Sequence, residues 1–227
     1  MDEIEVYPQS RNCYSAGDLV VPAVPAAPPQ VHFFDDSARA AASCCSLVLF
    51  GLAGPGAHYL RAAFPAREPV GKVTAAALSE KTKRPGVCCS LFTVALPAAA
   101  AGAKAEVALM AICDGAVPDE QASQWAETVL SAVGAPCGAA AAKASDPLPT
   151  LLVLAGMRAA RFIGTQGSGA PCYFLASGEA QKVSASEICS RAMQTAAALP
   201  PPNVIAGAAA ALLTYAQLGG LRAAVFV

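Results

Sequence analysis

The sequence predicts an α/β domain in which helices cover a mainly parallel or mixed β-sheet. Two observations indicate this class: short blocks of bulky apolar residues, typical of buried strands, alternate along the chain with stretches of helical spacing. The 227 residues suffice for one domain with a substantial core, or for two small ones. The hydrophobic fraction of 55% overstates that core, because much of it is alanine, which buries little area per residue.

We divide the chain into a Pro-rich N-terminal arm, residues 1–30, and a single α/β domain, residues 31–227. Four prolines interrupt small residues between positions 22 and 29. Proline removes backbone donors and fixes φ, which favours an extended, loosely held segment. The ordered domain is expected to start at 31–34, and Asp35 and Asp36, followed by alanines, indicate the start of a helix.

The first part of the domain contains three predicted strands. Residues 46–50 are predicted to be a buried strand that ends in a glycine turn, and a helix is predicted over 58–64. Residues 88–96 and 107–113 are the next two strands. The alanine-rich segment 98–103 between them is typical of a hairpin connection of variable length.

The clearest helix in the sequence follows. Asp119 and Glu120 lie in its first turn, where the helix dipole favours carboxylates. Apolar residues continue at helical spacing as far as Val133, and Gly134 is suited to end the helix in the left-handed conformation. Trp125, the only tryptophan, lies on this apolar stripe, and we expect it to be a core residue.

The last third of the domain is predicted to alternate strand and helix again. Residues 150–155 form a strand, and a polar, glycine-rich stretch follows at 165–169. Ser184 and Glu187 have the spacing of a capping box before a short helix, 188–193.

The carboxyl end has well-marked boundaries. Three prolines at 200–202 block any helix, and Asn203 is predicted to cap the next helix at its N-terminus. Gly219 and Gly220 are predicted to end that helix. Residues 222–227 are then predicted to form a final strand.

Charge and composition argue against several classes of partner. The formal net charge is −1 and no basic stripe stands out, so neither nucleic acid nor an anionic membrane is an expected partner. No run of about 20 apolar residues indicates a membrane-spanning helix, and the acidic start of the chain is unlike a secretory signal. Nine cysteines without a C-x-x-C pair indicate reduced thiols in a cytoplasmic or nuclear protein. With only two histidines and no spaced Asp/Glu/His set, no metal is expected, and no cofactor is predicted.

Catalysis has one candidate location, the turn from Gly51 to His58. A strand, a glycine turn and a helix start can bind phosphate through backbone N–H groups, as in a phosphorylase-like or hydrolase-like enzyme. The spacing here is G-x-x-G-x-G without a following Lys-Ser or Lys-Thr, and no G-x-S-x-G elbow occurs. A tight strand-to-helix turn is the favoured interpretation, so the sequence predicts a non-catalytic protein.

Three segments, in order, carry a resemblance to a known family. They are P-N-V-I at 202–205 continuing to A-A-A-L-L-T-Y-A-Q at 209–217, Q-A-S-Q-W-A-E at 121–127, and the strand with a short basic turn at 150–158. The F-F-D-D start at 33–36 is similar to plant and green-algal members. Together the segments resemble proteasome assembly chaperone 1, the first subunit of the heterodimeric proteasome assembly chaperone.

The resemblance implies a three-layer α/β/α sandwich with a mixed sheet, similar to nucleoside phosphorylases but without their catalytic residues. It implies pairing with a proteasome assembly chaperone 2-like subunit and binding to proteasome core-particle α subunits during α-ring assembly, in the cytoplasm and also the nucleus. Family members commonly dock a hydrophobic-Tyr-X tail. Here Val225, Phe226 and Val227 have Phe in place of Tyr. These three are the candidate partner-binding residues, although the core-strand interpretation is better supported because they continue a strand.

A third hypothesis is a general scaffold that presents the Pro-rich arm as a polyproline ligand. Pro22 and Pro25 have the P-x-x-P spacing, but no basic residues flank them. This hypothesis ranks last.

Overall fold

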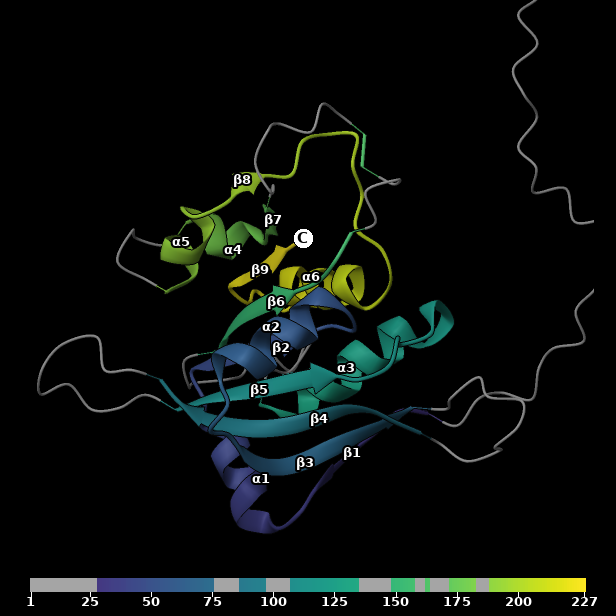
Figure 1. The fold of residues 1–227 in the computed structure, drawn as a ribbon, viewed down its shortest axis with the longest axis vertical. Helices are drawn as coiled ribbons and strands as arrows, with labels where there is room; N and C mark the ends of the chain where they lie inside the picture. The colour runs from purple at the N-terminus through teal and green to yellow at the C-terminus, as the bar shows by residue number, and fades with distance from the viewer. Residues whose placement is uncertain are drawn as a thin grey trace, which may run out of the picture.

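The computed structural model describes residues 28–75, 86–96, 107–134, 148–157, 162–163, 172–182 and 188–227. In this part of the chain one twisted sheet carries helices on both faces (Figure 1). Several predicted features lie outside the described residues: nearly all of the Pro-rich arm, the alanine-rich connection 98–103, the stretch 165–169, and the capping box of Ser184 and Glu187.

The sheet is mixed, as the sequence predicts. Within the described residues it has nine strands, in the order β1-β3-β4-β5-β2-β6-β9-β7-β8. The neighbouring pairs β1-β3, β3-β4 and β4-β5 are antiparallel. The next pairs, β5-β2, β2-β6 and β6-β9, are parallel. At the far edge β7 is antiparallel to β9 and parallel to β8. The bounds are β1 Gln30–Phe33, β2 Leu47–Gly51, β3 Glu68–Ala75, β4 Gly86–Ala95, β5 Val107–Cys113, β6 Thr150–Leu154, β7 Tyr173–Ala176, β8 Ala197–Ala198 and β9 Ala223–Phe226.

The helices form two layers, one on each face of the sheet, and the α/β/α sandwich expected from the sequence is confirmed. Buried residues of α1, α3 and α6 share one core cluster with the sheet, and those of α2, α4 and α5 share the other. The bounds are α1 Asp36–Ser43, α2 Pro55–Ala63, α3 Ala122–Ala132, α4 Gly178–Gln181, α5 Ile188–Met193 and α6 Gly207–Leu218.

The central strand β2 is buried on both faces, which explains its unbroken run of bulky apolar residues. Because successive side chains of a strand point to opposite faces, Val48 and Phe50 pack against the layer of α1, α3 and α6. Leu47 and Leu49 pack against the layer of α2, α4 and α5. β2 therefore contributes to both halves of the core.

Helix α3 forms where the sequence predicts it. A 3₁₀ turn, η1 (Asp119–Gln121), carries the two acidic residues, and the α-helix continues from Ala122. Trp125 is completely buried, and its ring meets that of Phe50 edge to face with centroids 6.1 Å apart. Gly134 follows the helix with a φ of 74°, the left-handed conformation expected there.

The start of α6 corrects the prediction for Asn203. The N-cap of α6 is Ala206, and the helix begins at Gly207. The side chain of Asn203 instead accepts a hydrogen bond from the N–H of Ile163 at 2.7 Å and donates to the carbonyl oxygen of Ile163 at 2.8 Å. The side-chain amide of Asn203 thus pairs with both the N–H and the carbonyl oxygen of Ile163, a residue distant in the sequence, because an amide has one acceptor and one donor group.

A buried hydroxyl joins β7, α4 and β9. Ser177 is 1% exposed, and its Oγ donates to the carbonyl oxygen of Leu221 at 2.7 Å. The same oxygen accepts from the N–H groups of Ala223 at 3.0 Å and Ala180 at 3.3 Å. One side chain therefore satisfies three backbone groups at the start of β9 and at the N-terminus of α4.

We expect Ser177→Ala to lower the free energy of unfolding by about 2 kcal/mol, since it leaves buried backbone groups without their partner. Urea denaturation measures the loss. Ser43→Ala is the matched control: the exposed Ser43 hydroxyl donates to the Arg39 carbonyl oxygen within its own helix, α1. Equal stability of the two variants would contradict a structural role for Ser177.

Candidate functional site

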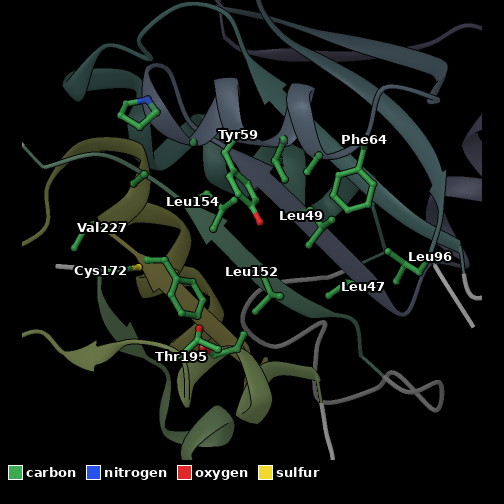
Figure 2. A pocket seen from close by; sticks show the side chains of 17 residues that line it. Leu47, Leu49, Tyr59, Phe64, Leu96, Leu152, Leu154, Cys172, Thr195 and Val227 are labelled. Atoms are coloured by element: carbon green, nitrogen blue, oxygen red, sulfur yellow. The ribbon is translucent and has the colours of Figure 1, made fainter. Parts of the chain in front are cut away.

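An apolar cleft opens on the face of the sheet covered by α2, α4 and α5. It has a volume of about 550 Å³ and lies between α2 and α5, above β2, β6 and β9 (Figure 2). Residues from all of these elements line it: Leu47, Leu49, Pro55, Gly56, Tyr59, Leu60, Ala63, Phe64, Leu96, Leu152, Leu154, Ala155, Cys172, Ala192, Thr195, Phe226 and Val227.

The pleat of the strands builds the floor of the cleft. Leu47 and Leu49 of β2 lie beside Leu152 and Leu154 of β6, since the register of the parallel pair matches Leu49 with Leu152. Alternate residues of both strands therefore point toward the cleft, and the residues between them point into the opposite core cluster. Bulky leucines at every second position give the floor its apolar character.

The two walls come from the helices. Tyr59 and Phe64 stand on the α2 side, and Ala192 and Thr195 stand on the α5 side. Figure 2 shows the Tyr59 ring reaching over Leu154 from the helix. Tyr59 is 64% exposed, which makes it one of the large hydrophobic side chains that solvent reaches most easily.

The side chains that line the cleft are mostly apolar. None of the described lining residues has an acidic or basic side chain, and their polar side-chain groups are the hydroxyls of Tyr59 and Thr195 and the thiol of Cys172. Although Cys172 is exposed overall, partial burial of its thiol raises the pKa of this group, so it is uncharged at neutral pH. The cleft is therefore suited to apolar side chains of a partner and not to acid–base chemistry.

The catalytic alternative at the glycine turn finds little support in the geometry. Pro55, the first residue of α2, has no N–H. The N–H groups of Ala57 and His58 donate to the carbonyl oxygens of Leu52 and Gly54. The helix start thus lacks the row of available N–H groups that a phosphate requires. The His58 side chain is exposed, and no hydrogen bond to a nucleophile is seen for it among the described residues.

The candidate partner-binding residues lie in and beside β9. Val225 is completely buried between β6 and β7, opposite Val153 and Leu175. Phe226 and Val227 line the cleft, and the Val227 N–H donates to the Tyr173 carbonyl oxygen at 2.9 Å. The predicted strand over 222–227 is confirmed. A partner-binding role stays a prediction, and in this arrangement only Phe226 and Val227 can contribute to it, through the cleft.

The described ranges contain neither a membrane-spanning helix nor a cluster of metal ligands. No helix there is long and apolar enough to cross a membrane. No group of three or more His, Cys, Asp or Glu side chains in the same ranges is arranged to hold a metal ion.

The fold and cleft define a three-layer α/β protein with an apolar site, and solved structures share this fold. No protein-family model matches the chain, and no curated protein sequence matches it. Pyrococcus furiosus PbaA, described as an archaeal homologue of proteasome-assembly chaperone, superimposes with a TM-score of 0.55 at 16% identity, over 88% of this chain and 71% of its own.

Two more structures show the same fold. Pyrococcus furiosus PbaB, described as an archaeal proteasome activator, has a TM-score of 0.56 at 10% identity and covers 88% of this chain and 79% of its own. A Thermoplasma acidophilum protein of unknown function has a TM-score of 0.51 at 13% identity, over 82% of this chain and 67% of its own. The chain is thus similar in fold to these proteins along most of its length.

Proposed function

We propose that this protein is a proteasome assembly chaperone subunit that acts by binding other proteins. The observation that carries the proposal is the shared fold with PbaA and PbaB over 88% of the chain. The ordered sequence segments that resemble proteasome assembly chaperone 1 support the same assignment independently of the fold. The protein acts in the cytoplasm and also in the nucleus, where it takes part in assembly of the α ring.

The proposed partners are a second, related chaperone subunit and proteasome core-particle α subunits. The second chaperone binds at the apolar cleft, because stable heterodimer interfaces are more apolar at their centre than the rest of a protein surface. The described side chains of the lining carry no charge, so they match an apolar patch on that subunit. They disfavour a charged side chain, which would lose its hydration in the cleft without an oppositely charged side chain to pair with.

Affinity purification of the tagged protein from extract of its own cells tests the function. Mass spectrometry is expected to identify a second chaperone subunit together with proteasome α subunits. Recovery of the chaperone subunit alone would support pairing and refute α-subunit binding under these conditions. If neither class of protein is enriched over an untagged control, the proposal is wrong.

A matched pair of variants tests the cleft. Tyr59→Glu places a charge at the rim of the cleft. We expect at least a tenfold loss of affinity for the second subunit, since tyrosines that a partner covers often contribute much of the binding energy of an interface. Leu218→Glu is the control: Leu218 is 70% exposed, ends α6, and belongs to the layer on the other face of the sheet. Calorimetric titration measures the affinity of each variant for the second chaperone subunit. If both variants bind as tightly as the unaltered protein, the cleft is not the binding site, whatever the affinity purification shows.

A further inference from the structure

Two cysteines face each other across neighbouring antiparallel strands. Cys89 of β4 pairs directly with Cys113 of β5. The N–H of Asp114 donates to the carbonyl oxygen of Cys88 at 3.1 Å, which places the Cys89–Cys113 pair at a non-hydrogen-bonded position of the ladder. At such positions the Cα atoms are about 4.5 Å apart and the side chains are closest, within the range in which disulfides form.

The two thiols also share one environment. Both side chains belong to the core cluster under α1, α3 and α6, with exposed fractions of 0% for Cys89 and 1% for Cys113. The pKa of the Cys89 thiol is raised well above its usual range. The larger cause is hydrogen bonding with the Cys113 thiol, and burial is the second cause. The Cys88 thiol donates to the carbonyl oxygen of Val73 at 3.5 Å, and the Cys89 thiol donates to the carbonyl oxygen of Ser90 at 3.8 Å. The register of the two strands makes Cys89 the residue opposite Cys113.

A small cavity lies beside one of the two cysteines. Cys113 ends β5 and lines a cavity of about 180 Å³ near the carboxyl ends of β2, β5 and β6. The segments that follow these strands and the start of α6 complete it, with Leu52, Gly115, Gly156 and Gly207 among the lining residues. A water molecule occupies about 30 Å³ of liquid, so a molecule of the size of hydrogen peroxide fits beside Cys113.

We propose that Cys89 and Cys113 form a reversible cross-strand disulfide when the protein meets a peroxide. The Cys113 thiolate attacks one peroxide oxygen, the O–O bond breaks, and the departing hydroxide is protonated to water, leaving a sulfenic acid on Cys113. The Cys89 sulfur then attacks the Cys113 sulfur, the S–O bond breaks, and hydroxide takes the Cys89 proton to form a second water. Two thiols are thereby oxidised and one hydrogen peroxide is reduced.

The roles of the two cysteines follow from their surroundings. Cys113 reacts first because it lines the cavity, whereas Cys89 is completely buried. The high pKa of Cys89 keeps this thiol protonated, so it is a poor first target for peroxide, which reacts with thiolates. A small thiol such as dithiothreitol reverses the bond by exchange. The proposal is independent of the proposed function.

The test uses the full chain in its folded form. The protein is treated with hydrogen peroxide, free thiols are blocked with N-ethylmaleimide under denaturing conditions, and tryptic peptides are analysed with and without reduction. Trypsin leaves Cys88 with Cys89 on one peptide and Cys113 with Cys137 on another, so fragmentation assigns the bond. We expect a Cys89–Cys113 link that dithiothreitol removes, and a higher melting temperature for the oxidised protein than for the reduced one.

Two variants give the assignment its control. Cys113→Ala is expected to lose the linked peptide, and Cys172→Ala, which removes an exposed thiol, is expected to keep it. The result on the unaltered protein decides the question even if Cys113→Ala fails to fold. Oxidation of the exposed Cys44 and Cys172 shows that the peroxide has acted. If Cys89 and Cys113 both carry maleimide at that point, the proposal is overturned. A link from Cys113 to Cys88 or Cys137 would also overturn it.

Discussion

Trp125→Ala is expected to lower the free energy of unfolding by about 3–5 kcal/mol, the largest loss we foresee from truncating a single side chain. Trp125 is completely buried in α3 and packs edge to face on Phe50 of the central strand. Its removal would leave a cavity between α3 and β2, which the surrounding strands are too constrained to fill. Chemical denaturation followed by circular dichroism measures the change, because the variant has no tryptophan to report by fluorescence.

Trp125→Phe removes the indole N–H and keeps most of the packing at this position. The Nε1 of Trp125 is buried and has no hydrogen-bond partner among the described residues. Phe keeps most of the ring contact, so we expect it to lose clearly less stability than Ala does. A loss below about 1 kcal/mol for Trp125→Ala would show that the α3–β2 contact contributes far less than its burial indicates.

Gly56→Ala is expected to cost about 3 kcal/mol of stability, at the upper end of the usual range for overpacking. Gly56 lies in the first turn of α2, directly against β6. A Cβ at this position would lie 2.6 Å from the carbonyl carbon of Leu154, which is a backbone atom in the sheet. The contact can be relieved only if α2 moves away from β6, so the variant should also widen the cleft.

Gly115→Ala is the matched control for this substitution. Gly115 follows β5, and a Cβ there would have no heavy atom within 4 Å. We expect its melting temperature to stay within a degree or two of that of the unaltered protein, since surface changes without contacts usually have small effects. A similar melting temperature for Gly56→Ala would mean that α2 does not lie as close to β6 as described.

The sequence was informative where burial on both faces leaves a simple pattern. β2, β5 and β6 are central strands, and their unbroken apolar runs predicted them within about one residue. The stripe of α3 and the glycines after α6 also located these helices correctly. In each case the signal lies within a few neighbouring residues.

Other features depend on residues far apart in the chain. β3 was not predicted, because Glu68, Pro69 and Lys72 interrupt any apolar alternation and the strand is held by its neighbours β1 and β4. The role of Asn203 depends on Ile163, whose position relative to it only the fold determines. The cleft likewise depends on the space between α2 and α5, and a local pattern contains no information about that distance.

The order of strands in the sheet has a consequence for how the chain acquires its structure. β3, β4 and β5 are neighbours both along the chain and in the sheet, so they can associate after closing only short loops. β2 joins β6, and β6 joins β9, only after long stretches of chain have been brought together, which costs more entropy. The antiparallel half is therefore suited to form first and to act as a template on which the parallel half is completed. On this basis, amide protons of β4 and β5 should become protected early in refolding, before those of β9.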